Sequence, residues 1–544
     1  MQVAHFLEAD LQPWARTLAT AAIADELEAS GTSAFHHYLD MGSLQRPMRR
    51  RLDKLAPFGD ALETVLRAAR LPLAELLPWT PAKWQPAVIT SRAIPKLILD
   101  AAEAAACCDA MHAARGVRSV SLSLWVESEA HAHIVPGARL SDAQGATGPA
   151  RPDTERLPRA CAAVAALPAL RHLEICDTGD FTDGAAATEA LAPALSRLSA
   201  LEDLVFTVDG SGDAGAAALA PALSLLTTLT SLNLDSNGFG ADGAAVLASA
   251  LEAHTALKEI ELSGNSFGVA GAQALAPVLR CLSQLQVLDL GGCDIRAAGA
   301  QALAPALRRL SQLRLLDLSD NDIDDLGATA LAPSISLLTA LTELRLDLND
   351  IEAVGAEALA PALGHLSSVQ VLTLSCNGIT FHGAEALAPA LSHLWELDDL
   401  DLTHGRIGAD GAAALAPSLR LLFALETLRL AGNWFGTAGA RSLAPSLSRL
   451  SSLEKLNLDH NDIGDDGAAA LAPALRLLTG LCCLSISDND IGDAGVVSLL
   501  PALALLTELW SLKLKIGNDV SAAGVAAFRA GVPDNVWEAS DFVG

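Results

Sequence analysis

Several short motifs in this sequence have the residue types and spacing of enzyme sites. Residues 238–243 and 210–215 both fit Gly-x-Gly-x-x-Gly, the spacing with which dinucleotide-binding turns let a pyrophosphate approach the backbone. Residues 264–268 fit Gly-x-Ser-x-Gly, the spacing of a serine nucleophile on a sharp turn. The acidic turn at residues 487–495 carries several carboxylates, but their spacing does not match a calcium loop. Taken singly, the motifs indicate unrelated chemistries.

A repeat of 28 residues accounts for all of these motifs. Its unit reads L-x-x-L-x-L-x-x-N-x-I-x-x-x-G-A-x-A-L-A-P-A-L-x-x-L-x-x, so the glycine runs belong to one family of turns. Ser266 is incidental because it only follows the repeated asparagine. We therefore predict a protein that is not an enzyme and has no cofactor or metal site. The repeated asparagines are Asn237, Asn265, Asn321, Asn349, Asn377, Asn433, Asn461 and Asn489.

Each repeat predicts one strand followed by one helix. The first part alternates apolar and polar residues, which is strand periodicity, and the second has apolar residues at helical spacing. Such units stack into an α/β solenoid with a parallel sheet on the concave face and helices on the convex face. The stack must curve, because helices are about 10 Å thick whereas strands lie about 4.8 Å apart.

The asparagines are expected to form a ladder that bonds the backbone of the turns. Two repeats hold Cys293 and Gly405 in this position, and their turns should be looser or filled by water. The same position falls at Asp209 before the series and at Gly517 after it. The proline in most repeats falls inside the predicted helix and should kink or split it.

The repeat resembles the ribonuclease-inhibitor class of leucine-rich repeats. The likeness covers roughly residues 117–530 and includes the Gly-Ala-x-Ala-Leu-Ala core, present here at 411–416. Ran GTPase-activating proteins, sensor arms of NOD-like receptors and GALA-type bacterial effectors are similar to this class. The uniform repeat length departs from the ribonuclease inhibitor itself, which alternates two lengths. The resemblance implies a horseshoe that binds proteins.

The ends of the chain differ from the repeats. Residues 1–116 are expected to form a helical N-terminal cap or an adaptor domain, because a solenoid needs its terminal apolar face covered. A polar stretch rich in glycine and proline predicts a loop insertion at 128–155 within the solenoid of residues 117–530. Residues 531–544 contain Trp537 and Phe542 and are expected to form a C-terminal cap.

Charge and cysteine content indicate the kind of partner and compartment. The net charge is −28, and almost all of it falls after residue 116. Such acidity disfavours nucleic acid and anionic membranes and favours a partner protein with a basic surface. The 9 scattered cysteines show no disulfide framework, and the N-terminus lacks the pattern of a secretory signal. We expect a cytoplasmic monomer, delivered into a host if it is a bacterial effector.

Two groups of residues are candidates for partner binding. One is acidic and lies where alternate strand residues face the concave side. Reversal of Glu261, Asp289 and Asp317 to lysine is expected to leave folding intact and to abolish capture, and mutual repulsion should raise some of these pKa values. The second group lies at one rim and includes an exposed tryptophan beside charged residues. The residues of both groups are Asp235, Glu261, Asp289, Asp317, Asp347, Asp401, His404, Arg406, Trp434 and His460.

Two alternative functions follow from the family resemblance. A GTPase-activating protein similar to the Ran regulator needs no nucleotide site of its own. An F-box-like substrate receptor in ubiquitin ligation is suggested by residues 71–78, which loosely resemble the start of an F-box. The leading hypothesis is a protein–protein interaction module with an acidic concave surface.

Overall fold

A computed structural model describes residues 119–123, 170–177 and 184–542. The predicted N-terminal domain and the predicted loop at 128–155 lie outside these residues. The chain divides into two compact units, residues 1–210 with 221–229 and residues 211–220 with 230–544. In the first unit β1 (Ser119–Ser123), β2 (His172–Asp177) and β3 (Asp203–Val208) pair in parallel, and α9 (Gly184–Leu195) connects the last two. Helix α10 (Gly212–Leu223) contains residues of both units.

The second unit alternates short strands with helices, one pair in each repeat. Its elements in chain order are β4 (Ser231–Asn233), α11 (Ala241–Leu251), β5 (Glu259–Glu261), α12 (Gly268–Leu279), β6 (Val287–Asp289), α13 (Arg296–Leu307), β7 (Leu315–Asp317), α14 (Asp325–Ile335), β8 (Glu343–Arg345), α15 (Ala353–Leu363), β9 (Val371–Thr373), α16 (Thr380–Leu391), β10 (Asp399–Asp401), α17 (Gly408–Leu419), β11 (Thr427–Arg429), α18 (Gly436–Leu447), β12 (Lys455–Asn457), α19 (Gly464–Leu475), β13 (Cys483–Ser485), α20 (Asp493–Leu503), β14 (Ser511–Lys513), α21 (Ala522–Gly531) and α22 (Asp534–Glu538).

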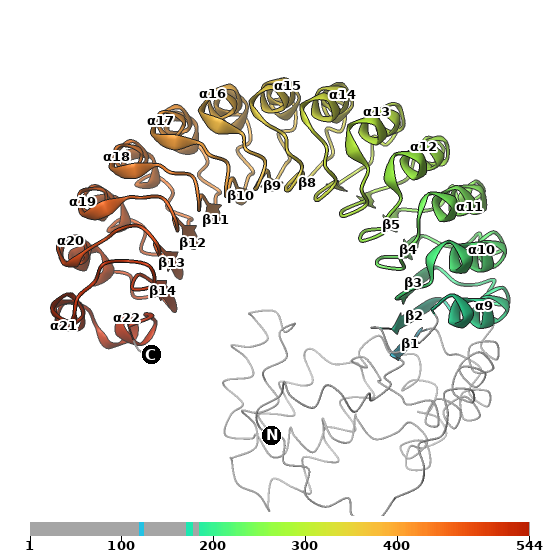
Figure 1. The fold of residues 1–544 in the computed structure, drawn as a ribbon, viewed down its shortest axis with the longest axis horizontal. Helices are drawn as coiled ribbons and strands as arrows, with labels where there is room; N and C mark the ends of the chain where they lie inside the picture. The colour runs from blue at the N-terminus through green and yellow to red at the C-terminus, as the bar shows by residue number, and fades with distance from the viewer. Residues whose placement is uncertain (1–118, 124–169, 178–183, 543–544) are drawn as a thin grey trace, which may run out of the picture. The chain divides into compact units, whose positions relative to one another are not determined.

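Every strand from β4 to β14 pairs in parallel with the next strand along the chain, in a register of one repeat. Glu261 lies beside Asp289, for example, and Asp289 beside Asp317. Within this unit the strands line the inner side of an arc and the helices its outer side (Figure 1). The predicted α/β solenoid is thus confirmed. The register matters for function, because equivalent residues of successive repeats become neighbours.

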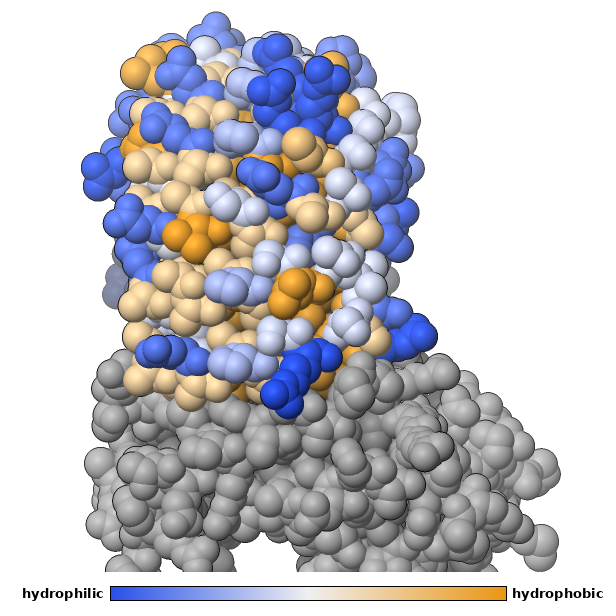
Figure 2. All heavy atoms as spheres, turned by 90° about the vertical axis from the view of Figure 1, so that its right-hand side faces the viewer, coloured by the Kyte–Doolittle hydropathy of each residue, from blue (hydrophilic) through white to orange (hydrophobic). Residues whose placement is uncertain are grey.

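Leucine, alanine and glycine set the spacing between repeats. Leu316, Ile323 and Leu331 are fully buried in one repeat. At the start of α14 a Cβ on Gly327 would lie 2.6 Å from Cγ2 of Ile323 and 3.0 Å from Cα of Ala297. Glycine therefore lets each helix approach its neighbour closely. On the side shown in Figure 2, the outward surface of the helices combines apolar areas with scattered charged groups.

The expectation that proline splits the helices is wrong. Each of the helices α12 to α20 continues through its proline as a single helix. Pro277 is exposed and lies in the last turn of α12, and the residue four positions earlier, Gln273, is exposed as well. The hydrogen bond that proline removes is therefore on the solvent side, where water can reach the carbonyl group.

The repeated asparagines form hydrogen bonds between successive turns, in a line that is interrupted at Cys293 and Gly405. The Nδ2 of Asn349 donates to the carbonyl oxygens of Leu318 and Leu346, and its Oδ1 accepts from the N–H of Asn321 and Ile323. Asn349 is fully buried. Each asparagine from Asn265 onward thus satisfies backbone groups of its own repeat and of the repeat before it.

The two exceptions to the asparagine pattern behave differently. The turn at Cys293 is not loose, because the buried Sγ donates to the carbonyl of Leu262 at 3.2 Å and replaces part of the missing amide. Gly405 offers no such group. The N–H groups of Asn377 and Ile379 would donate to the side-chain oxygen of an asparagine at position 405. Because that residue is glycine, these two groups have no acceptor within the described part of the chain. Gly405 N–H itself donates to Asn433.

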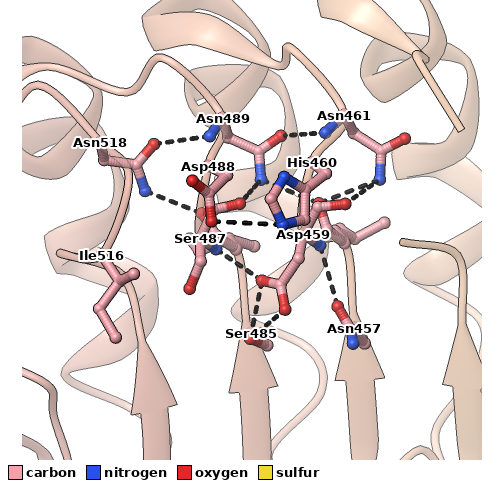
Figure 3. A network of polar contacts seen from close by, with 12 residues as sticks. Asn457, Asp459, His460, Asn461, Ser485, Ser487, Asp488, Asn489, Ile516 and Asn518 are labelled. Carbon is pink, nitrogen blue, oxygen red and sulfur yellow. Dashed lines mark hydrogen bonds and ion pairs between the residues drawn. The ribbon is translucent and has the colours of Figure 1, made fainter. Parts of the chain in front are cut away.

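Both ends of the asparagine series differ from the sequence expectation. Asp209 is exposed, so it does not take the buried position. After the series the position moves by one residue from Gly517 to Asn518, whose Oδ1 accepts from the N–H of Asn489 at 2.9 Å (Figure 3). Beyond it, the carboxylate of Asp541 accepts from the N–H groups of residues 514–516. Phe528, Trp537 and Phe542 pack together beside this end.

Candidate functional site

Three acidic strand residues and one from the turn after β4 form a line on the concave face, here called the acidic stripe and defined as Asp235, Glu261, Asp289 and Asp317. The last three occupy the same register position of β5, β6 and β7. The stripe ends at β8, where Arg345 approaches Asp317 at 3.5 Å and Glu343 at 2.9 Å. The concave face is therefore acidic in its first part and contains ion pairs after it.

Carboxylates of the stripe also support the backbone. The Oδ1 of Asp289 accepts from the N–H of Gly291 at 2.9 Å, and that of Asp317 accepts from the N–H of Ser319 at 2.9 Å. Asp317 is only 6% exposed. Lysine has no acceptor and would place a cation in a buried or half-buried position, so for these two residues we now expect the reversal to lower the stability of the fold, against the expectation from the sequence.

Burial, more than repulsion, shifts the acidity of the stripe. Desolvation raises the pKa of Asp289 to about 6, against the hydrogen bond from Gly291 and with smaller contributions from Asp317, Asp235 and Glu261. Desolvation also raises the pKa of Asp235, although Ser263 and Asn233 donate hydrogen bonds to it. Mutual repulsion, the cause expected from the sequence, contributes less than burial.

We expect Asp289→Asn to stabilise the protein by about 1 kcal/mol at pH 7.5, after allowance for solvent screening of a half-buried group. The pKa of this carboxyl is higher in the folded chain (about 6) than in the unfolded chain (about 3.9). The folded state then binds more protons, and stability falls as pH rises from about 4 to about 6. Asparagine keeps an acceptor for the N–H of Gly291 but does not ionise, so the loss of stability with rising pH disappears.

Urea unfolding at pH 4.5 and pH 7.5 measures the effect of Asp289→Asn as a difference from the wild type. Asp322→Asn is the matched control, because Asp322 is an exposed carboxylate in the turn after β7. A gain that is equal at both pH values would contradict the explanation by burial.

The remaining acidic candidates are engaged with neighbours further along the sheet. Asp347 accepts a hydrogen bond from the hydroxyl of Thr373. Asp401 accepts from the N–H of Thr403 at 2.9 Å and lies 4.0 Å from Arg429, which also contacts Asp399. These two carboxylates are separated from the acidic stripe by Arg345, so the sequence candidates do not form one acidic surface.

The turns after the strands hold side chains in an unusual backbone conformation. In nearly every repeat of the second unit, the residues before and after the ladder position have a positive φ in the left-handed region. Glycine, aspartate and serine occupy most of these positions, as steric limits favour. The larger exceptions belong to neighbouring repeats: Leu348, Cys376, His404, Arg406, Trp434 and His460.

All of these exceptions except Leu348 line one open hollow of about 540 Å³. We call it the rim hollow and define it by its lining: Asp350, Glu352, Cys376, Asn377, Gly378, His404, Arg406, Gly432, Trp434 and His460. The sequence candidates His404, Arg406, Trp434 and His460 are therefore brought together, whereas the acidic stripe lies elsewhere. Acidic groups lie at the end with lower residue numbers, and cationic and aromatic groups at the other.

Glycines make room for the large side chains of the rim hollow. Gly432 has a φ of 66°, and a Cβ on it would collide with the imidazole of His404. The ring of His404 thus lies across the next turn. His460 interacts with Asp488 at 3.4 Å, and Asp459 accepts from Ser485 and Ser487 beside it (Figure 3). Trp434 remains 59% exposed.

Sequence reasoning missed Asp350, Glu352 and Cys376 as parts of this site. The sequence did contain a signal, because the residues on either side of the ladder asparagine are glycine, aspartate or serine in most repeats but differ in this region. Burial, followed by the charges of Asp401 and Asp347, raises the pKa of the Cys376 thiol. A thiol with a raised pKa is protonated at neutral pH and is a poor nucleophile.

The enzyme-like motifs remain ordinary turns of the repeat. Ser266 is exposed, and its N–H donates to the carbonyl of Phe239 as part of the stacking. No group of His, Cys, Asp or Glu side chains suited to a metal ion occurs among the described residues. In the same part of the chain, no helix has the length and apolar character needed to cross a membrane.

Comparison with known proteins identifies the repeats. Ten segments match the family model described as leucine-rich repeat, and no curated protein matches the sequence. Among solved structures, an internalin from Listeria monocytogenes is similar at 20% identity, with a TM-score of 0.43, over 66% of this chain and 94% of that one. The segments are 226–248, 253–276, 283–304, 311–332, 338–360, 365–388, 397–416, 424–444, 449–472 and 481–500.

Proposed function

Because this chain belongs to the leucine-rich-repeat family, we propose that it is a protein-interaction module whose partner docks on the rim hollow. The observation that carries the proposal is the backbone conformation of the lining residues. His404, Arg406, Trp434 and His460 have φ values of 54–56°. Side chains other than glycine and asparagine cost roughly 1 kcal/mol or more in this region. Positive φ recurs in nearly every repeat, but most other repeats place glycine, aspartate or serine there, so the large side chains gather in these neighbouring turns, as is typical of binding sites.

The composition of the rim hollow supports this role. Tryptophan and arginine are enriched among the residues that contribute most to protein interfaces. Trp434 and Arg406 are both exposed and lie in adjacent repeats.

The acidic stripe contributes to the proposal through long-range attraction. It carries Glu261, Asp289 and Asp317 on adjacent strands of a chain whose net charge is −28. A concave face of one sign accelerates the encounter with a partner of the opposite sign. The stripe therefore favours a partner with a basic surface that lies along the strands and reaches the rim hollow.

Replacement of Trp434 by asparagine is the test of this proposal. Asparagine tolerates a positive φ, so folding stability is expected to stay equal or to rise by up to about 1 kcal/mol. Loss of an interface anchor of about 2 kcal/mol corresponds to roughly 30-fold weaker binding. The measurement is affinity purification with quantitative mass spectrometry, followed by titration of the recovered partner.

Trp395→Asn is the matched control for this test. Trp395 is 61% exposed, close to the 59% of Trp434, but does not line the rim hollow. Partners that are retained by the control and lost by Trp434→Asn support the proposal. Partner recovery that is unchanged in Trp434→Asn removes the rim hollow as the docking site.

GTPase activation and adaptor recruitment are separate hypotheses from the sequence. Hydrolysis assays of the full chain with a panel of small GTPases test the first. Binding of the full chain to a Skp1-type adaptor tests the second, and residues 71–78 fall outside the described part of the chain.

A further inference from the structure

We propose that the rim hollow recognises a single anionic group on the partner, either a carboxylate or a phosphate, held by Arg406 and His404 beside Trp434. This inference rests on the proposed function and names the chemistry that the partner must present. It is independent of the acidic stripe, which attracts the opposite charge.

The first support is that Arg406 has no internal counter-charge. On the concave face Arg345 contacts Asp317 and Glu343, and Arg429 contacts Asp399 and Asp401. Among the described residues, no carboxylate oxygen lies within 4.0 Å of the guanidinium of Arg406. Asp350 and Glu352 line the same hollow, but neither carboxylate forms an ion pair with Arg406.

The second support is the arrangement of groups around Arg406. The backbone of Arg406 and of His404 is fixed in the left-handed region, and Gly432 leaves the space in which the His404 ring lies. His460 is less available, because Asp488 lies 3.4 Å from its Nε2. A guanidinium presents a planar fork of donors that matches carboxylate and phosphate oxygens. Trp434 adds an apolar surface for the chain that carries the anion.

Charge elsewhere in the hollow restricts the occupant further. Asp350 and Glu352 repel an anion from the opposite end of the hollow, and the net charge of −28 repels a partner with many carboxylates. The structure therefore favours an isolated anionic group on an otherwise neutral or basic segment. A cation near that group would meet Asp350 or Glu352.

Small aromatic probes test this inference with the full chain. Calorimetric titration compares phenyl phosphate and phenylacetate as anions with benzylamine as the cation. We expect the wild type to prefer the anions, and Arg406→Gln to weaken anion binding by about tenfold or more, since a charge-assisted pair is lost. Arg420→Gln is the matched control and should bind within about twofold of the wild type, because Arg420 is exposed outside the hollow.

The outcomes separate the two proposals. Preference for phenyl phosphate or for phenylacetate identifies the source of the charge. The inference is overturned if neither anion binds at millimolar concentration, if Arg406→Gln binds them as the wild type does, or if benzylamine binds most tightly. In each of these cases a loss of partner capture in Trp434→Asn would leave the proposed docking site intact.

Discussion

Replacement of Asn433 by alanine is expected to lower the free energy of unfolding by about 3 to 4 kcal/mol. The Nδ2 of Asn433 donates to the carbonyl oxygens of Leu402 and Leu430, and its Oδ1 accepts from the N–H of Gly405 at 2.9 Å. The side chain is fully buried. Alanine would leave these backbone groups without partners in a place that water cannot easily enter.

A second asparagine of the next repeat provides the control. Asn457 lies half-buried on the concave face, where its Oδ1 accepts from the N–H of Asp459 at 2.9 Å. Asn457→Ala should cost less than about 1 kcal/mol, because water can replace the lost hydrogen bond. Chemical unfolding followed by circular dichroism measures both variants. Equal losses for the two would show that burial in the ladder is not the source of the stability.

The second large effect is expected for Gly327→Ala, a loss of about 2 to 4 kcal/mol through overpacking. The added methyl group would lie 2.6 Å from Cγ2 of Ile323 and 3.0 Å from Cα of Ala297. The second contact is with backbone of the preceding helix, so it can be relieved only if two repeats move apart. That movement would also strain the hydrogen bonds between their turns.

Gly364→Ala is the matched control for this prediction. Gly364 follows α15 with φ −61° and ψ −13°, and the nearest atom to an added methyl group is a carbonyl oxygen at 3.6 Å. Alanine fits there and reduces the entropy of the unfolded chain, so stability should rise by about 0.5 to 1 kcal/mol. Thermal unfolding of the two variants gives opposite signs if close helix approach is the reason for the repeated glycine. A harmless Gly327→Ala would rule that reason out.

The fold was predictable because the repeat is uniform. An asparagine every 28 residues defines the register of strands, and the alternation of apolar residues defines the buried face. The rim residues were found for a related reason, since Trp434 and His404 stand where other repeats have small residues. Their common hollow was not predictable, because it depends on the space beside Gly432 and Gly378.

Other features depend on side-chain directions that the repeat pattern does not contain. The bonds from Asp289 and Asp317 to their own turns need particular rotamers, and so do the ion pairs of Arg345. The tolerance of proline follows from its place on the solvent side of the last turn. The move from Gly517 to Asn518 follows from one extra residue in the turn after β14, which the spacing of earlier repeats gave no means to foresee.

The ladder also determines how an array of this kind can change its length during evolution or in engineering. Every ladder asparagine serves the turn of the preceding repeat, so a repeat taken from the middle is complete only together with its successor. Whole units of 28 residues can therefore be duplicated or deleted without an orphaned turn. Asn518 and Asp541 end the series differently, and a shortened array would have to retain them.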